Sequence, residues 1–374
     1  MEIGVVVHGP NIIDSGYAND IIDLLKEYGD VSARLGGTMG RTAVIDNSLE
    51  EIIDISQKLV PSDSLKLFLD ENKDIIFLLN YGKSDVTGQV FGYKVVNHYF
   101  DKTNNKNIPI IQIERPGEND GSVILWCGDY EELADKIASK LSLNRVTPNE
   151  IFEKHFKQDF KDSRTHRLVH GVSPGENIMV NSVVIGKATS DNLVLIAEDG
   201  YIVDIVGGIL KPHGVEKLSK IDLDSAIIKT GLLRKSDVKP RVLEKKQEGD
   251  KFKVAFLDHA GEDVYKYSDM DLVITIGDDT TLISSDILYR LDIPIIGITD
   301  GDLDKVVEHG YKKEDSIIFE LESGFDDIVG RRIFDEIFNN SNVLEFDKDV
   351  KIKIKNLIIE ILNNMNCKYK IKVI

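Results

Sequence analysis

The chain has 374 residues, of which 42% are hydrophobic and 29% are charged. This composition argues against a disordered or fibrous protein, and at roughly 100–200 residues per domain the length predicts two or three domains. The net charge is −18, and a surface this acidic repels phosphate backbones and anionic headgroups, which argues against general nucleic-acid or membrane-surface binding.

Cysteine content and apolar runs indicate a cytoplasmic protein. Cys127 and Cys367 are the only cysteines, too few for a disulfide framework or a cysteine zinc cage. The first residues, MEIGVVVHGPN, lack the basic and apolar regions of a signal peptide. No apolar run approaches the roughly 18 residues that a membrane-spanning helix needs.

Short apolar runs alternate with amphipathic stretches through residues 1–146. The apolar runs predict strands at 3–7, 31–35, 75–79, 108–113 and 123–126. Helical spacing predicts helices at 17–28, 50–59, 86–100 and 130–141. Strands that are apolar on both faces and separated by helices form a parallel sheet covered on both sides. Residues 1–146 are therefore expected to form a Rossmann-like three-layer domain.

A complete helix-start signal follows this domain. Thr147 suits the N-cap, Pro148 suits the first helical position, and Glu150 can close a capping box with Thr147. The pattern predicts a helix to about residue 160, within a linker that spans 147–166 and marks the domain boundary.

The second domain is expected at 167–342. Its first part, 167–215, is rich in Val, Ile and Gly, and Asp199-Gly200 is a hairpin turn signal, so an antiparallel insertion is expected there. The alternating pattern then returns, with strands at 254–257, 272–276, 294–298 and 316–321 and helices at 262–267 and 282–291. Residues 343–374 are expected to form a C-terminal helix at 352–365 and a basic tail. The predicted fold class is α/β, with two Rossmann-like three-layer domains of mainly parallel sheets and a small antiparallel insertion.

Three successive strands of the second domain run into loops that carry aspartates. These are Asp258, then Asp279, then Asp300 and Asp302. Because ligands bind outside the carboxyl ends of parallel strands, and clustered carboxylates suit Mg²⁺, these four residues are candidate metal ligands. The alternative is that they cap a helix and form ordinary turns.

The segment between these aspartates is a candidate phosphate site. Gly277 allows a tight turn, and the N–H groups of Thr280 and Thr281 at the start of a helix favour an anion. Residues 271–298 resemble the nucleotide-phosphate segment of the NAD-kinase and diacylglycerol-kinase superfamily, and four matching residues carry over: Gly277, Asp279, Thr281 and Leu282. Asp278 and Thr280 stand where that family has glycines, which puts kinase activity in doubt. Asp300-Gly301-Asp302 also resembles the Mg²⁺-binding Asp-x-Asp of Toprim domains.

In the first domain, the loop after the second strand is a candidate anion site. Its candidate residues are Gly36, Gly37, Thr38, Gly40, Arg41 and Thr42. The glycines permit close approach of the backbone, and the Arg and Thr side chains supply hydrogen-bond donors. The alternative is a turn in which glycines merely allow a positive φ. His8 at the end of the first strand is either a general base or, more often for such a position, a structural histidine.

Taken whole, the chain is similar to an uncharacterised archaeal protein family, typical of methanogens and classed as a domain of unknown function. The passages that carry the resemblance are HGPNIIDSGYA, ARLGGTMGRTAVID, GDDTT and ITDGD. The resemblance implies no established activity.

The sequence therefore predicts binding of a nucleotide or phosphorylated small molecule, with Mg²⁺ as the expected cofactor. If the protein is an enzyme, Mg-dependent phosphoryl transfer or phosphoester hydrolysis fits an acid-lined site best. The alternative is a non-catalytic ligand sensor or assembly partner. A homo-oligomer is left open, and neither general nucleic-acid binding nor membrane binding is expected.

Overall fold

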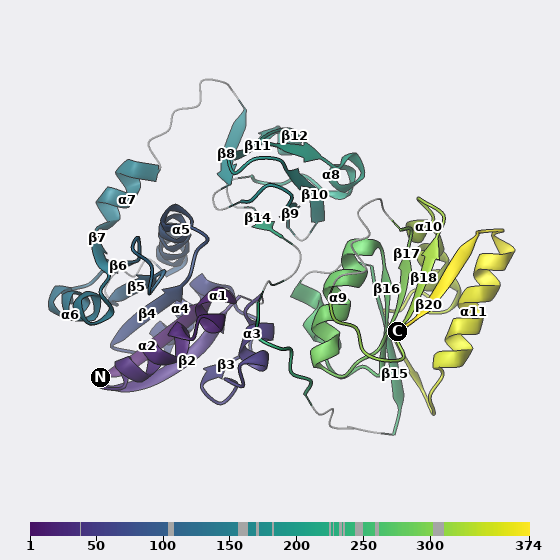
Figure 1. Cartoon of the computed structure of the whole chain (residues 1–374), viewed down its shortest axis with the longest axis horizontal. Coiled ribbons are helices and arrows are strands. Elements are labelled where there is room, and N and C mark those ends of the chain that lie inside the picture. The colour runs from purple at the N-terminus through teal and green to yellow at the C-terminus, as the bar shows by residue number, and fades with distance from the viewer. Residues whose placement is uncertain are drawn as a thin grey trace. The chain divides into compact units, whose positions relative to one another are not determined.

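A computed structural model describes residues 1–37, 39–103, 108–155, 164–169, 172–181, 183–223, 226, 228–231, 234, 236–243, 250–258, 262–301 and 310–374. It confirms the predicted fold class, with two large, mainly parallel sheets and a smaller antiparallel part (Figure 1). The chain divides into two compact units. The first comprises 1–178, 185–228 and 234–239, and the second comprises 179–184, 229–233 and 240–374. The candidate residues Thr38 and Asp302 lie outside the described residues.

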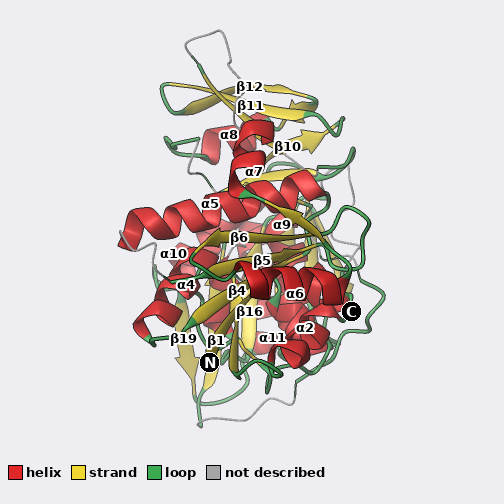
Figure 2. Cartoon of the chain, turned by 90° about the vertical axis from the view of Figure 1, so that its left-hand side faces the viewer, coloured by secondary structure: helices red, strands yellow, loops and turns green. Residues whose placement is uncertain are grey.

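The first unit is built on a seven-stranded sheet. Its order is β3 (Ile53–Asp54), β2 (Asp30–Gly36), β1 (Glu2–His8), β4 (Ile75–Asn80), β5 (Ile110–Glu114), β6 (Ser122–Cys127) and β7 (Asn144–Val146). Figure 2 shows β4, β5 and β6 side by side. All neighbours are parallel except β5 and β6. The loop between those two strands is too short for the crossover that parallel strands need, so the antiparallel pairing follows from chain length.

Helices cover both faces of this sheet. On one face, α1 (Asn11–Asp14), α2 (Tyr17–Leu25), α3 (Arg41–Asp46) and α6 (Glu131–Leu141) contribute to the apolar cluster that contains Val5 and Val7. On the other, α4 (Pro61–Asp70) and α5 (Asp85–Thr103) pack on Val6. Successive residues of a strand point to opposite faces, so a strand that is apolar throughout contacts the helices on both faces of the sheet.

The helix predicted at 50–59 is wrong. This stretch contains turns and the short strand β3, and the helix begins at Pro61 instead. Ile53 is fully buried as the register partner of Ala33 in β2. Pairing and burial at the sheet edge therefore override the helical spacing of this segment.

The helix start at Thr147 is confirmed. The Thr147 backbone N–H donates to Glu150 Oε2 at 2.7 Å, and the Glu150 N–H reaches Thr147 Oγ1 at 3.3 Å. These two bonds form the capping box that the sequence predicts. The helix α7 is described over Pro148–His155, and its predicted continuation to about 160 lies outside the described residues.

The β-rich part contains two small sheets. One has the order β12 (Tyr201–Val206), β11 (Leu193–Glu198), β8 (Thr165–Val169). The other has the order β13 (Gly208–Leu210), β10 (Val183–Ala188), β9 (Asn177–Val180), β14 (Ile228–Thr230), and α8 (Pro212–Lys217) follows β13. Asp199 and Gly200 have φ values of 53° and 86°, the positive φ at both positions that a type I′ turn needs. The predicted hairpin turn is confirmed.

The second unit carries a six-stranded sheet. Its order is β19 (Val343–Phe346), β15 (Phe252–Leu257), β16 (Leu272–Ile276), β17 (Ile295–Thr299), β18 (Ile317–Leu321) and β20 (Tyr369–Val373). The four central strands are parallel and the two edge strands antiparallel. The short 3-10 helix η1 (Glu262–Tyr267) and α9 (Asp278–Arg290) pack on one face. The other face is covered by α10 (Asp326–Glu336) and α11 (Lys351–Asn364).

Two features of this unit differ from the prediction. The predicted basic tail is not a free tail, because Tyr369–Val373 pairs with β18 as an edge strand. The helix α9 begins at Asp278, one turn before the predicted start at Leu282. The first turn of α9 contains polar residues, so a prediction based on apolar spacing does not include it. Thr281 is one of these polar residues, and it is fully buried.

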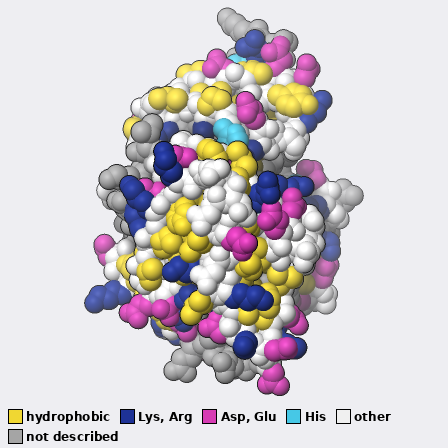
Figure 3. Space-filling model, turned by 90° about the vertical axis from the view of Figure 1, so that its right-hand side faces the viewer, with side chains coloured by type: hydrophobic (Ala, Val, Ile, Leu, Met, Phe, Trp, Pro, Cys, Tyr) yellow, Lys and Arg dark blue, Asp and Glu magenta, His cyan; other side chains and the backbone are white. Residues whose placement is uncertain are grey.

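Among the described residues, no helix is long and apolar enough to cross a membrane. On the face shown in Figure 3, Lys and Arg side chains lie interspersed with Asp, Glu and apolar side chains. Among the described residues on that face, basic side chains do not gather into one continuous patch.

Candidate functional site

The strand order of the first sheet reverses between β1 and β4. At this point His8, the last residue of β1, is the register partner of Asn80, the last residue of β4. Asn80 is in turn the register partner of Glu114, the last residue of β5. Three neighbouring parallel strands thus end in polar side chains at the topological switch point, where open α/β sheets bind their ligands.

A continuous series of hydrogen bonds joins these strand ends. Trp126 Nε1 donates to Gln112 Oε1 (3.0 Å), and Gln112 Nε2 donates to Glu114 Oε2 (2.7 Å). Asn80 Nδ2 donates to the same oxygen (2.8 Å), while Asn80 Oδ1 lies 2.8 Å from His8 Nδ1. We call these five residues the polar chain. Asn80, Gln112 and Glu114 are all buried, so each bond replaces water that the side chain has lost.

Helix α5 lies directly on the polar chain because it carries two glycines one turn apart. A Cβ at Gly88 would lie 1.9 Å from Glu114 Cδ, and one at Gly92 would lie 1.7 Å from Gln112 Oε1. The Gly88 carbonyl oxygen also accepts a 2.9 Å hydrogen bond from Gln112 Nε2. The glycines therefore let the helix backbone seal this side of the polar chain.

Glu114 is the only carboxyl of the polar chain. Complete burial raises its pKa to about 7, against the hydrogen bonds from the Gly82 N–H, Asn80 and Gln112, which favour the ionised form. Desolvation is the larger effect. A carboxyl whose pKa lies near neutrality is typical of functional sites.

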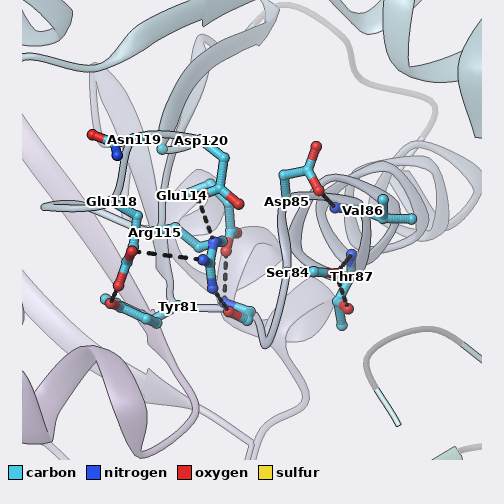
Figure 4. Close-up of polar contacts among 12 residues, drawn as sticks. Tyr81, Ser84, Asp85, Val86, Thr87, Glu114, Arg115, Glu118, Asn119 and Asp120 are labelled. Carbon is cyan, nitrogen blue, oxygen red and sulfur yellow. Dashed lines mark hydrogen bonds and ion pairs between the residues drawn. The ribbon is translucent and has the colours of Figure 1, made fainter. Parts of the chain in front are cut away.

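The loop after β4 is held by two consecutive residues, Glu114 at the end of β5 and Arg115 directly after it. Gly82 N–H donates to Glu114 Oε1 at 2.6 Å, and the Gly82 carbonyl oxygen accepts from Arg115 Nη1 at 2.6 Å. Figure 4 shows Arg115 between Asp120, at 2.9 Å, and the ring of Tyr81. Tyr81 donates its hydroxyl to Glu118, and burial together with that carboxylate raises the pKa of Tyr81 to about 12. These contacts tie the loop after β4 to Glu114, Arg115 and Glu118.

The glycine loop after β2 lies against His8. A Cβ at Gly37 would be 3.6 Å from His8 Cδ2 and 3.9 Å from Nε2, and the φ of Gly37 is 94°. A Cβ at Gly40 would be 3.1 Å from the Gly9 carbonyl oxygen. The His8 ring also stacks on Phe91, with the centroids 3.9 Å apart. The loop that the sequence selected for anion binding thus borders the polar chain.

Arg41 has a structural contact that the sequence did not indicate. It is the first residue of α3, and its Nη2 donates to the carbonyl oxygen of Ile55 in the loop after β3. Thr42 is buried. The guanidinium therefore ties two segments together, and anion binding by Arg41, Thr42 and Gly36 stays a prediction.

The aspartates of the second unit lie at one edge of its sheet. Asp258, Asp279 and Asp300 follow the carboxyl ends of β15, β16 and β17, which are parallel neighbours. Asp300 Oδ2 accepts a 2.7 Å hydrogen bond from the Gly324 N–H. Within the described part of the chain, no group of three or more His, Cys, Asp or Glu side chains is arranged to hold a metal ion. Metal binding at this edge stays a prediction.

The expectation for the Thr281 N–H needs correction. This N–H donates to the Gly277 carbonyl oxygen at 2.9 Å, because α9 begins early enough to make Thr281 part of its hydrogen-bonded interior. The Thr281 hydroxyl is buried 2.9 Å from that of Thr275. Thr281 therefore packs the core and offers no donor to a ligand. Gly277 has the expected positive φ, 90°, and the Thr280 hydroxyl contacts the Asp258 carbonyl oxygen at 3.4 Å.

Asn80 and Glu114 are not among the candidate ligand or metal residues named from the sequence, although each begins a loop at the carboxyl end of a predicted strand. One available signal was that each is a polar residue directly after an apolar strand, next to a glycine-containing loop. The spacing of Gly88 and Gly92, four residues apart in an amphipathic helix, was a second signal, since a helix keeps such glycines where something packs closely.

Comparison with known proteins places the chain in a family. A family model described as an uncharacterized protein conserved in archaea (DUF2117) matches residues 5–341. This chain belongs to the DUF2117 family. An uncharacterized protein of Methanocaldococcus jannaschii is 50% identical over 342 residues, which cover 88% of this chain and 90% of that protein. No solved structure matches the chain. The DUF2117 match includes the polar chain and confirms the resemblance to an archaeal family, without assigning an activity.

Proposed function

We propose that this DUF2117 protein binds a nucleotide or another phosphorylated small molecule at the carboxyl edge of its first sheet. The observation that supports this most strongly is the meeting of His8 and Asn80 at the switch between β1 and β4, with the glycine loop at Gly37 against the His8 ring. Glycine loops let backbone N–H groups approach a phosphate closely, and an imidazolium can donate a hydrogen bond from Nε2 to its oxygens.

The second unit supports a further candidate, Mg²⁺-dependent phosphoryl transfer or phosphoester hydrolysis. Asp258, Asp279 and Asp300 follow neighbouring parallel strands, and hard oxygen ligands of this kind suit Mg²⁺ together with a substrate phosphate. The local resemblance of 271–298 to the NAD-kinase and diacylglycerol-kinase superfamily favours nucleotide phosphates at this edge.

Thermal-shift screening of nucleotides and phosphorylated metabolites tests the binding proposal. A ligand at 100 times its Kd adds about 2.7 kcal/mol to the free energy of unfolding, so a true ligand gives a clear shift. The His8→Ala variant should lose the shift, while His98→Ala, at an exposed position of α5, should keep it. A screen with no hits, or hits that both variants retain equally, would contradict binding at this edge.

Metal and turnover are tested separately. Mg²⁺ titrated at constant ionic strength should stabilise the wild type and not Asp300→Asn, a variant that can still accept the hydrogen bond from Gly324. Equal stabilisation of both proteins would make Asp300 an ordinary turn residue. Incubating a confirmed ligand with Mg²⁺ and measuring released phosphate tests phosphoester hydrolysis, since a non-catalytic sensor binds without turnover.

A further inference from the structure

We propose that His8 is an acid–base group at the first sheet's carboxyl edge, held by the polar chain in the tautomer that carries its proton on Nδ1. In this assignment His8 Nε2 accepts a proton from a hydroxyl or phosphate oxygen of the ligand, becomes an imidazolium, and returns the proton afterwards. The assignment of the tautomer rests on the polar chain alone, and the exchange with a ligand rests on the proposed function.

Trp126, at the end of the polar chain away from His8, determines which atom of each pair donates and which accepts. The indole N–H can only donate, so the Gln112 atom 3.0 Å from it must be the amide oxygen. The other end of the Gln112 amide is then the NH₂ group, which points to the Gly88 carbonyl oxygen at 2.9 Å and to Glu114 at 2.7 Å. The Gly88 carbonyl oxygen and the Glu114 carboxyl can both accept, so this orientation of the Gln112 amide satisfies all three of its contacts.

Glu114 passes this direction on to Asn80. One of its oxygens accepts from the Gly82 N–H, another group that can only donate, and the second oxygen accepts from Gln112. Above its pKa of about 7 Glu114 is mainly a carboxylate, which has only acceptors, so the Asn80 atom 2.8 Å from it is the NH₂ group. The remaining end of the Asn80 side chain, which faces His8, is therefore its carbonyl oxygen.

This carbonyl oxygen determines the proton on His8. Asn80 Oδ1 lies 2.8 Å from His8 Nδ1, and two acceptors at that distance would repel, so Nδ1 must carry hydrogen. In the neutral ring Nε2 is then the basic nitrogen. The indole N–H of Trp126 and the backbone N–H of Gly82 can only donate. Through Gln112, Glu114 and Asn80 they select the tautomer of His8, which lies three strands from Trp126 in the sheet.

The ring is also held in place. His8 stacks on Phe91 with an interplanar angle of 17°, and its Cδ2–Nε2 edge faces the glycine loop at Gly37. When Nε2 takes up a proton, Asn80 Oδ1 still accepts from Nδ1, and the buried carboxyl of Glu114 favours the positive charge through the polarised amide. An amide does not carry protons in this step, so Asn80 and Glu114 are positioning residues.

Nuclear magnetic resonance of the full-length chain with ¹⁵N-labelled histidine tests the tautomer directly. Long-range ¹H–¹⁵N correlations distinguish protonated from unprotonated ring nitrogens, and the His8 signals are identified by their loss in His8→Asn. At a pH above the pKa of Glu114, the neutral His8 ring should show a single form with hydrogen on Nδ1, unlike exposed His98 and His213, which serve as internal references. Hydrogen on Nε2, or a mixture like that of the references, overturns the proposal.

An Asn80→Leu variant tests the role of the polar chain, with Asn97→Leu on α5 as its control. The first should abolish the single tautomer of His8, and the second should preserve it. A single Nδ1-protonated form that survives Asn80→Leu overturns the positioning role of Asn80. If Asn80→Leu does not fold, the wild-type spectrum still decides the tautomer.

Inorganic phosphate is the probe for proton exchange. On its addition, His8 Nε2 should move toward the protonated signal, while the His98 and His213 signals stay unchanged. Phosphate that stabilises the protein but leaves His8 Nε2 unchanged overturns the acid–base role and not binding. Phosphate and screened ligands that neither stabilise the protein nor shift His8 contradict the proposed function, while the tautomer result is judged by its own spectrum.

Discussion

Glu114 and Asn80 are register partners at the ends of two neighbouring parallel strands, and the Asn80 amide donates a 2.8 Å hydrogen bond to the Glu114 carboxyl. The contact is buried, so Glu114 depends on protein donors in place of water. Two opposed effects act on this carboxyl: burial favours its neutral form, and its donors favour the ionised form.

The raised pKa of Glu114 predicts a pH-dependent stability. Its pKa is about 7 in the folded protein against an ordinary 4.5. Between these values the folded state keeps a proton that the unfolded chain releases, so the stability due to protonated Glu114 is complete below pH 4.5 and is lost as the pH rises to 7. At about 1.4 kcal/mol per unit the loss is roughly 3 kcal/mol. Urea unfolding of wild type and Glu114→Gln across this pH range isolates the effect. The two proteins share every other titratable group, and only the wild type has a titratable side chain at position 114. A difference between the two proteins that stays constant as the pH rises to 7 would show that folded Glu114 is ionised throughout this range.

Gln112 is expected to be essential to the buried hydrogen bonds. Gln112→Leu preserves the volume but leaves the Trp126 N–H and the Gly88 carbonyl oxygen without this partner. We expect a loss of roughly 1–3 kcal/mol in the free energy of unfolding. Gln57→Leu, at an exposed position, should change it by about 0.5 kcal/mol or less. Equal effects of the two substitutions would show that the buried amide contributes nothing specific.

Gly88→Ala should destabilise the protein, although alanine usually stabilises a helix by roughly 1 kcal/mol relative to glycine. Its Cβ would lie 1.9 Å from Glu114 Cδ, inside a packed layer. Overpacking of this kind costs roughly 1–3 kcal/mol or more. His98→Ala on the exposed side of the same helix should be nearly neutral in thermal unfolding. A more stable Gly88→Ala would mean that α5 does not lie on Glu114 at this distance.

Arg234 forms a buried ion-pair cluster in the first unit. Its Nε donates to Asp14 Oδ2 at 2.6 Å, and its Nη1 donates to Asp46. The Arg234 side chain is only 4% exposed. Arg234→Ala removes the positive charge that faces two largely buried carboxylates, so it should cost roughly 3–5 kcal/mol. Arg234→Lys should rescue little, because an ammonium cannot serve two carboxylates with a planar fork.

Urea unfolding of these variants has a control in Arg331→Ala. The Arg331 side chain is 74% exposed and pairs with Asp335, and surface pairs contribute about 0–1 kcal/mol. An effect of Arg234→Ala as mild as this control would show that the contacts of Arg234 with Asp14 and Asp46 do not stabilise the fold.

The sequence by itself determined the elements whose causes are local. The capping box of Thr147 and Glu150 joins residues three apart, and the Asp199-Gly200 turn depends on backbone preferences of two adjacent residues. The alternation of apolar strands and amphipathic helices likewise determined the fold class, because burial on two faces leaves a periodic signal in the chain.

Only the tertiary structure decided how distant polar residues meet. His8, Asn80, Glu114 and Trp126 come from four strands, and the register that aligns them depends on the pairing of whole strands. The same holds for Ile53, which joins a sheet edge against its helical pattern, and for Arg41, whose partner at Ile55 belongs to a separate loop. The physical reason is that periodicity reports which face of an element is buried, whereas hydrogen-bond partners and desolvation are properties of what lies across that face.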